Sequence, residues 1–156
     1  MLEIDIPGFG AVKLKHLVSD FTGTLSFNGK LIPGVKEHLN KLSESLSIHV
    51  LTSDTFGTSK SELNDVRCEL HILEGEYHDL QKEEFVEKLG AIHVVAYGNG
   101  NNDRKMLRAA RVGIAVTEGE GCSVDILMAA TVHVTSITAG LDLLVHPLRL
   151  KATLRY

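Results

Sequence analysis

The segment Asp20-Phe21-Thr22-Gly23-Thr24 places a carboxylate directly after the apolar run Leu17-Val18-Ser19 and then turns through a glycine. Such a run predicts a buried strand, so Asp20 is expected at the tip of that strand, facing a loop of small hydroxylated residues. A carboxylate in this position can attack a phosphoryl group while Mg²⁺ steadies the charge. By itself the segment is more often a turn whose aspartate caps its own loop. The assignment of Asp20 as nucleophile therefore depends on three later segments.

These three segments place further polar residues after apolar runs or in a helix. Thr52-Ser53-Asp54 follows Ile48 to Leu51, and Gly98 to Asp103 follows Val94 to Tyr97. Between them, Lys82 opens a predicted helix. Ligands of open parallel sheets gather beyond the carboxyl ends of the strands. The residues expected to meet at this edge are Asp20, Thr52, Asn99 and Asp103.

At these motifs the sequence resembles the haloacid dehalogenase-like (HAD) hydrolase superfamily and, within it, the phosphorylation domain of P-type ATPases and their soluble relatives. That domain carries Asp-Lys-Thr-Gly-Thr, a strand-end Thr-Gly-Asp, Lys-x-x-x-Val and Gly-Asp-Gly-x-Asn-Asp, in this order. The matching segments are Asp20 to Thr24, Thr52 to Asp54, Lys82 to Val86 and Gly98 to Asp103. The resemblance runs from about Leu14 to the strand Gly113 to Val116. Four motifs in the correct order are far more specific than any one of them.

The resemblance implies a role for each motif residue. Asp20 would attack phosphorus in line to give an aspartyl phosphate. Thr52 would donate a hydrogen bond to a phosphoryl oxygen, and Lys82 would neutralise charge on the nucleophile and the transferring group. The implied Mg²⁺ ligands are the Asp20 carboxylate, the backbone carbonyl of Thr22, Asn99 and, through water, Asp103. The residues implied to contact the substrate are Thr22, Gly23, Thr24, Ser53 and Asn102.

Two residues depart from the patterns of the superfamily. Its phosphatases usually carry a second aspartate, as general acid and base, two positions after the nucleophile; here that position is Thr22, as in the ATPases. General acid–base catalysis contributes on the order of 10²- to 10⁴-fold, so we expect slow turnover and a long-lived phosphoenzyme. Asn99 replaces a metal-binding aspartate of the ATPase motif and removes one negative charge. We therefore expect reduced Mg²⁺ affinity.

Lys82 and Lys88 lie close together, and the helical pattern favours the first as the site lysine. Lys82 shares a helical face with Val86 and Leu89, so its stem should lie towards the sheet. Lys88 aligns instead with Glu84 on the face predicted to meet solvent. Lys82 is also expected in the first turn, where the helix dipole disfavours a cation. A locally unfavourable residue that points at the site indicates a function.

Short apolar runs alternate with amphipathic stretches along the chain, which predicts an α/β fold: a parallel sheet with helices on both faces. Together with the resemblance, this indicates a three-layer, Rossmann-like sheet of the HAD type. The expected strands lie near Leu14 to Ser19, Ile48 to Thr52, Glu69 to Leu73, Val94 to Tyr97, Val112 to Val116 and Thr131 to Val134. Helical stripes are marked by Val35, Leu39, Leu42 and Leu46, and by Met106, Leu107 and Ala110.

Two hairpins and a last helix are also expected. Leu2 to Ile6 alternates polar and apolar residues before a Pro-Gly turn, which predicts an edge hairpin feeding the first core strand. Asn28-Gly29 lies between apolar residues, the strongest short hairpin pattern. In the resembled superfamily a flap lies at this place, beside the nucleophile. Thr135 or Ser136 should cap a last helix that Pro147 closes.

The length of 156 residues predicts a single domain, residues 1–156, without repeat, linker or low-complexity tract. The segments Leu25 to Pro33 and Glu74 to Asp79 leave no room for a cap domain, so we expect an open site. An open site suits a macromolecular phosphosubstrate, a cap supplied by another subunit of a homo-oligomer, or poor discrimination among small phosphate esters. The phosphorylated substrate is therefore of unknown size.

Charge and cysteine content narrow the class of protein. A net charge of −4 with dispersed Lys and Arg gives no support for a nucleic-acid or anionic-membrane partner. No apolar stretch approaches the roughly 20 residues that cross a bilayer, and the N-terminus has no basic region followed by an apolar one. Cys68 and Cys122 form no Cys-x-x-Cys motif, which suggests reduced thiols. We expect a cytoplasmic protein.

Other interpretations of the same residues remain. Gly98-x-Gly100 suggests a dinucleotide loop, but Asp103 occupies the third glycine position, and a calcium loop would need a glycine and a distal glutamate that are missing. A receiver domain also uses a strand-end aspartate, hydroxyl and lysine; the Gly-Thr after Asp20 opposes it. The histidines are scattered, one per predicted strand without the close pairs of a zinc site, and structural roles are expected for most of them. They are His16, His49, His71, His93 and His133.

A different functional class also stays open. Thr22 and Asn99 both depart from phosphatase patterns, so the domain could be a regulatory module that accepts phosphate on Asp20 without turnover, or that only binds phosphate. Accumulation of a phosphoenzyme without turnover would separate this class from a phosphatase.

Overall fold

The computed structural model describes all residues 1–156 and contains a six-stranded parallel sheet with the strand order β10-β9-β8-β3-β6-β7. The strands are β3 (His16–Asp20), β6 (Ser47–Thr52), β7 (Glu69–Ile72), β8 (Val94–Gly98), β9 (Val112–Val116) and β10 (Val132–Val134). All six lie within one or two residues of the predicted ranges. β3 is internal to the sheet, so its carboxyl end is flanked by those of β6 and β8.

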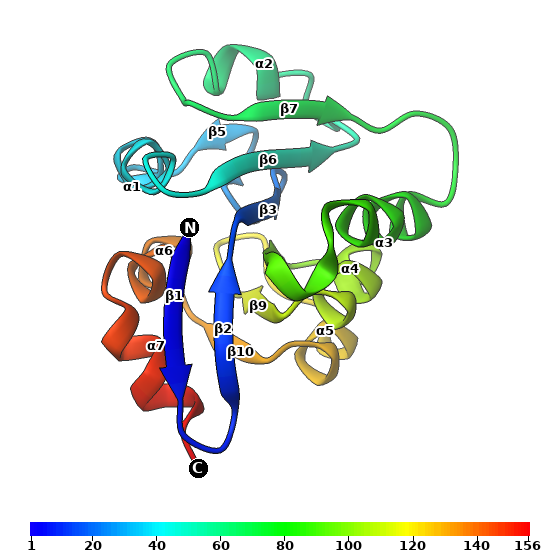
Figure 1. Ribbon diagram of the computed structural model, residues 1–156. Coiled ribbons are helices and arrows are strands. Elements are labelled where there is room, and N and C mark those ends of the chain that lie inside the picture. The colour runs from blue at the N-terminus through cyan, green and yellow to red at the C-terminus, as the bar shows by residue number, and fades with distance from the viewer.

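Helices cover both faces of the sheet, as predicted (Figure 1). One layer contains α1 (Val35–Leu42), α6 (Ile137–Val145) and α7 (Pro147–Leu154), and the other contains α3 (His78–Leu89), α4 (Arg104–Ala109) and α5 (Val124–Ala129). The shorter elements are α2 (Ser59–Glu62) and the 3₁₀ turns η1 (Ala91–His93) and η2 (Asn101–Asp103). None of the helices combines the length and the apolar character that crossing a membrane requires.

Neighbouring residues of the central strands contribute to two separate cores. Leu17 packs in the core under α1 and α6, whereas Val18 packs in the core under α3 and α4. Alternation along β8 is the same, with Val95 in the first core and Ala96 in the second. Because both faces are buried, these strands are largely apolar, and the polar residues Asp20 and Thr52 are the last residues of β3 and β6. The pattern of the sequence thereby fixes where the strand-end side chains begin.

The predicted N-terminal hairpin is present and leads into the first core strand from a small sheet of its own. β1 (Leu2–Ile6) and β2 (Gly10–Leu14) pair only with each other, as a separate antiparallel sheet. β2 leads through Lys15 into β3, which lies inside the main sheet. Both sides of β3 are already paired with β6 and β8, so the hairpin cannot pair with β3.

The second hairpin consists of β4 (Ser26–Phe27) and β5 (Lys30–Leu31), which follow the Asp20 loop. Its turn residues Asn28 and Gly29 both have positive φ angles, 49° and 75°. A two-residue type I′ turn requires this conformation, and asparagine and glycine adopt it most readily. The predicted flap is confirmed.

The end of the chain contains two helices where one was predicted. Ser136 caps α6, because its Oγ accepts a hydrogen bond from the backbone N–H of Ala139 at 3.2 Å. Pro147 does not close the last helix; it is the first residue of α7. Proline is favoured at this position because the first N–H groups of a helix have no intrahelical partner. The proline therefore marks the start of a helix, and one residue, His146, separates it from the end of α6.

Candidate active site

A buried ionic cluster lies at the carboxyl end of β3. The ammonium group of Lys82, on α3, donates hydrogen bonds to Oδ1 of Asp20 at 2.8 Å and to Oδ1 of Asp103 at 2.6 Å. The side chains of Lys82 and Asp103 are 1% and 0% exposed, and that of Asp20 is 9% exposed. Two carboxylates around one ammonium leave a net negative charge in a site that water barely reaches. Such an arrangement attracts a further cation.

Asp103 holds the loop after β8 as well as Lys82. Its Oδ2 accepts hydrogen bonds from the backbone N–H groups of Asn99 and Gly100, both at 3.1 Å. A Cβ atom at Gly98 would clash with the Asp103 side chain, so glycine is required at the strand end. Both carboxylate oxygens of Asp103 are therefore engaged within the chain, and the loop is fixed relative to Asp20.

The side chain of Lys82 points towards the sheet, as predicted, but Lys82 lies at a different position in its helix from the predicted one. α3 begins at His78, so Lys82 is its fifth residue and not in its first turn, and the argument from the helix dipole does not apply. The side chain still points to the sheet, as its face with Val86 predicted. Lys88 is 79% exposed and pairs with Glu84 at 4.0 Å, as expected for the solvent face.

Asn99 connects the Asp20 loop to the loop near Gly121. Thr24 Oγ1 donates to Asn99 Oδ1, and Asn99 Nδ2 donates to the Gly121 carbonyl oxygen, both at 3.1 Å. Gly23, with φ of 76°, passes so close that a Cβ there would lie 2.5 Å from Asn99 Nδ2. An aspartate could not donate to the Gly121 carbonyl. The amide at position 99 therefore has a structural partner that a carboxylate would lose.

The hydroxyl residues of the motifs differ in their surroundings. Thr52 is the last residue of β6 and is buried, and its Oγ1 accepts a hydrogen bond from the Asp54 N–H at 2.9 Å. This leaves the Thr52 hydroxyl hydrogen free to donate. Thr22 Oγ1 is buried without a hydrogen-bond partner. Ser53 and Asn102 are exposed, and neither contacts the ionic cluster.

Burial and charge act in opposite directions on Asp20 and Lys82. Burial, reinforced by the negative charge of Asp103, raises the pKa of Asp20 to about 7, although the Lys82 ammonium opposes the shift. Burial alone would lower the pKa of Lys82, but the two carboxylates outweigh it and hold that pKa above its usual value. Lys82 therefore stays protonated. A cation near Asp20 would favour the ionised form of the Asp20 carboxylate.

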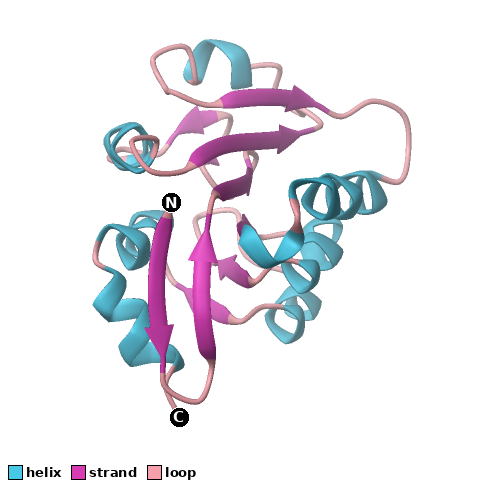
Figure 2. Cartoon of the chain, viewed as in Figure 1, coloured by secondary structure: helices cyan, strands magenta, loops and turns pink.

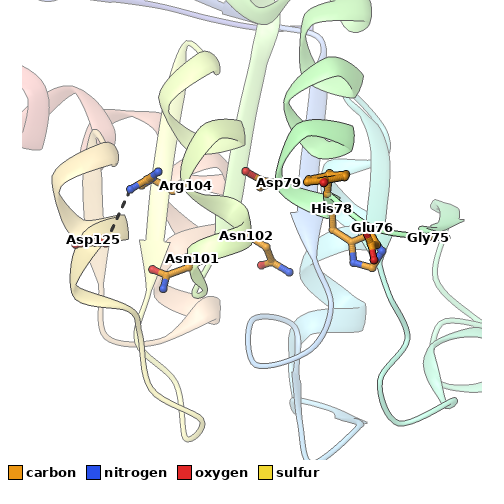
Figure 3. Close-up of a pocket in the computed structure, with 9 residues that line it drawn as sticks. Gly75, Glu76, His78, Asp79, Asn101, Asn102, Arg104 and Asp125 are labelled. Atoms are coloured by element: carbon orange, nitrogen blue, oxygen red, sulfur yellow. Dashed lines mark ion pairs between the residues drawn. The ribbon is translucent and has the colours of Figure 1, made fainter.

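An open polar cavity of about 610 Å³ lies between the start of α3 and the η2 turn. Figure 3 shows the two sets of lining residues on opposite sides. They are Gly75, Glu76, His78 and Asp79 on one side, and Asn101, Asn102, Arg104 and Asp125 on the other. Tyr77 also lines the cavity. Asn102 lines the cavity and is followed directly by the buried Asp103. Figure 2 shows the loop that crosses from β7 to α3; this loop supplies Gly75, Glu76 and Tyr77, and the start of α3 supplies His78 and Asp79.

The sequence predicted only Asn102 among these cavity residues. Arg104 and Asp125 form an ion pair at 3.9 Å across α4 and α5, and Asp79 pairs with Lys105 at 2.9 Å. These residues lie in no motif and come from three separate segments. Single charged residues in helices are usual on any solvated surface, so no local pattern could have identified them.

Comparison with known proteins shows which sequences and folds this chain is similar to. No family model matches its sequence. It is 42% identical over 62 residues, 40% of this chain and 67% of the other, to the uncharacterised protein MJ0073 of Methanocaldococcus jannaschii. It is 34% identical over 115 residues to the probable copper-transporting ATPase HMA5 of Arabidopsis thaliana. That match spans 72% of this chain but 11% of the ATPase.

Solved structures agree with these relatives. The 3-deoxy-D-manno-octulosonate 8-phosphate phosphatase of Moraxella catarrhalis, crystallised with magnesium and phosphate, aligns with a TM-score of 0.69 at 17% identity, over 85% of this chain and 86% of that chain. A zinc-transporting P-type ATPase aligns with a TM-score of 0.61 at 24% identity, over 79% of this chain and 20% of the ATPase. The chain therefore has the fold of HAD-superfamily phosphatases. Its sequence is related to MJ0073 and resembles the phosphorylation domain of P-type ATPases.

Proposed function

We propose that this chain is a Mg²⁺-dependent phosphohydrolase in which Asp20 forms an aspartyl-phosphate intermediate. The observation that carries the proposal is the buried cluster in which Lys82 bonds both Asp20 and Asp103 at the carboxyl end of β3. A lysine between two carboxylates neutralises the nucleophile and can then interact with the oxygens of an incoming phosphoryl group. The fold supports the same class, because the M. catarrhalis relative is a phosphatase.

The donor atoms around Asp20 fit a hard divalent cation. The hydrogen bond from Lys82 engages only Oδ1 of the Asp20 carboxylate. The Thr22 carbonyl oxygen accepts no hydrogen bond from a backbone N–H of the loop. Asn99 offers an amide oxygen, which accepts a hydrogen bond from Thr24. Mg²⁺ prefers such oxygen ligands. In this proposal Asp20, Thr22 and Asn99 bind the ion, and Asp103 contributes through water because both its oxygens are engaged. When bound, Mg²⁺ would offset negative charge on the phosphoryl oxygens.

In the first step of the proposed reaction, each residue of the site has a separate role. A carboxylate oxygen of Asp20 attacks phosphorus, the new O–P bond forms, and the bond from phosphorus to the leaving oxygen breaks. Lys82 remains protonated and stabilises the charge on the reacting groups. The Thr52 hydroxyl, free to donate, would bond a phosphoryl oxygen. Exposed Ser53 and Asn102 would form outer contacts, whereas Gly23 and Thr24 are buried and the Thr24 hydroxyl already bonds Asn99.

Hydrolysis of the intermediate is expected to be slow. Thr22 stands where a general acid and base would act, and its buried hydroxyl has no partner that could relay a proton. The leaving group must then take its proton from solvent, and water must attack without a base. The same feature favours the alternative function, a phosphate-accepting regulatory module that does not turn over. The polar cavity beside Asn102 offers space for the group that carries the phosphate.

An acid-quenched time course tests the proposal and separates the alternative. The protein would be mixed with acetyl phosphate or p-nitrophenyl phosphate and Mg²⁺, and both intact mass and released phosphate would be recorded. Asp20→Asn is the test variant, and Asp65→Asn, an exposed aspartate outside the site, is the matched control. Steady phosphate release that disappears only in Asp20→Asn supports a phosphatase. A stoichiometric adduct without turnover supports the regulatory module. The absence of both adduct and release contradicts the phosphatase and leaves a module that only binds phosphate.

A further inference from the structure

A second cluster of ligand-type side chains lies on the same sheet, away from Asp20. It contains His49 on β6 with Glu69 and His71 on β7, next to His16 at the start of β3. His16 precedes Asp20 by four residues, which is about 13 Å along a strand. The expectation that the histidines are scattered is therefore wrong for these three. Residues far apart in the sequence meet because parallel strands align them.

Strand register explains how the cluster forms. His49 lies opposite Glu69 on the neighbouring strand, and His71 lies two residues further along that strand. Residues two apart on a strand share a face, so all three side chains project to the face that α3 covers. The Phe85 ring of α3 packs over the pair, with its centroid 5.4 Å from that of His49 and 4.7 Å from that of His71.

The ligand atoms of the three residues converge. Oε2 of Glu69 lies 3.4 Å from Nδ1 of His49 and 3.7 Å from Nε2 of His71, and all three atoms lie within 4.8 Å of one another. Ligands about 2.1 Å from a tetrahedral zinc ion lie about 3.4 Å from each other. The two separations from Glu69 are close to this value, and the third pair of atoms lies within 4.8 Å.

Two of these nitrogens have no hydrogen-bond partner although they are buried. They are Nδ1 of His49 and Nε2 of His71. The side chain of His49 is only 6% exposed, so water does not readily take the place of a partner. A buried nitrogen without a partner costs free energy, and native structures rarely keep one without a reason. Both atoms face the Glu69 carboxylate without the geometry of a hydrogen bond.

His16 fixes the orientation that a ligand would need. Nε2 of His49 lies 3.4 Å from Nδ1 of His16, and with its proton on Nε2 His49 donates to that atom. The Nδ1 lone pair of His49 then points to Glu69. Histidine ligands of metals usually donate their other ring N–H to such a partner, which sets the tautomer.

We propose that His49, Glu69 and His71 bind one divalent transition-metal ion of the zinc type, and that His16 is a positioning residue for His49. Two imidazoles and one carboxylate suit such ions and leave a fourth position for water. Glu69 is 68% exposed, which gives the ion a path from solvent. Because β7 is an edge strand, the ion would join it to β6. The site is independent of the reaction at Asp20.

Cobalt binding tests the proposal with a direct spectroscopic readout. Metal-stripped protein would be titrated with Co²⁺ in excess Mg²⁺, in an Asp20→Asn background that weakens competition from the other site. We expect visible absorption of a four-coordinate Co²⁺ ion that saturates at one ion per chain and disappears when Zn²⁺ is added. Zn²⁺ should also raise the melting temperature of the same protein.

Matched substitutions decide which residues bind the ion. Glu69→Gln and His71→Gln should each weaken binding at least about tenfold and abolish the rise in melting temperature. The controls are Glu87→Gln and His133→Gln, which change exposed residues outside the cluster and should bind as the parent does. His16→Gln should weaken binding less than His71→Gln while keeping the tetrahedral spectrum, as a positioning role requires.

The result that overturns the proposal is the absence of Co²⁺ absorption and of any Zn²⁺ effect on melting. Equal binding by Glu69→Gln, His71→Gln and the parent would overturn it too, because the ion would then lie elsewhere. Glu69 is exposed, so its substitution is not expected to disturb folding. If circular dichroism shows His71→Gln to be unfolded, the Glu69→Gln result alone decides.

Discussion

The two clusters on this sheet solve the problem of buried polar groups in different ways. At the end of β3, the ammonium of Lys82 is paired with two carboxylates, and Asp103 has partners for both its oxygens. In the histidine cluster, the nitrogens that face Glu69 have no partners. The first site is held together by its own charges, and in the proposed function it accepts a phosphoryl group and a cation. The second presents neutral lone pairs, which is the arrangement that a metal ion would complete.

The largest effect is expected from removing the charge that holds the first site together. Lys82→Ala leaves two buried carboxylates without compensation, and breaking such a pairing typically costs about 3–5 kcal/mol. The free energy of unfolding, measured in urea, should fall by this amount, and phosphoenzyme formation should be lost. Lys88→Ala, on the exposed face of the same helix, should change stability by no more than about 0.5 kcal/mol. Similar values for the two variants would show that the cluster does not stabilise the fold.

The next largest effect concerns turnover at the same site. Thr22→Asp introduces a carboxylate where superfamily phosphatases have their general acid and base. Dephosphorylation should become faster, by about 10²-fold if the new group reaches the lower range of acid–base catalysis. Single-turnover decay of the phosphoenzyme measures this directly, with Thr22→Asn as the control of similar size that cannot carry a proton. Equal decay in both variants would place the cause of slow hydrolysis elsewhere.

A smaller effect distinguishes the neutral cluster by its response to acid. Burial is the main cause that lowers the pKa of His16 and the pKa of His49. The Glu69 carboxylate opposes this shift in both residues. For His49, the nearby rings of His16 and His71 lower the pKa further. Below pH 6.5 the unfolded chain binds protons that the folded chain resists, so stability should fall as pH drops from 6.5 towards the lowered pKa values. Above that window the contribution is constant.

Melting curves between about pH 5 and pH 7.5 in EDTA measure this response. Each kcal/mol lost lowers the melting temperature by about 2–4 °C in a protein of this size. The pH dependence should be weaker in His49→Gln, whose amide does not titrate, than in the control His133→Gln. An equal dependence in both variants would mean that other groups cause it.

The smallest effect is expected at Asn99. Asn99→Asp adds a negative charge at a proposed metal ligand, which should strengthen Mg²⁺ binding, but it also loses the hydrogen bond to the Gly121 carbonyl. Because these two effects oppose each other, the Mg²⁺ concentration that half-saturates phosphoenzyme formation should fall by only a few fold. Asn64→Asp, outside the site, is the control. No gain in affinity would indicate that the residue at position 99 does not reach the metal.

Much of the fold could be predicted because its determinants are local. The apolar runs that end in Asp20 and Thr52 are strands, and the first polar residue after each run marks the edge of the sheet. The Asn28-Gly29 turn likewise depends only on the conformations that these two residues adopt easily. Prediction failed at the end of the chain, where Pro147 starts a second helix instead of closing the last one.

The sequence by itself determined which residues stand at the strand ends and that a lysine on the following helix faces the sheet. These properties follow from the periods of strands and helices, which neighbouring residues fix. Only the tertiary structure decided that Lys82 bonds both carboxylates, and that His49, Glu69 and His71 converge beside Phe85. The reason is physical: strand order and register depend on packing among segments far apart in the chain, and a sequence read in one dimension does not specify which of them become neighbours.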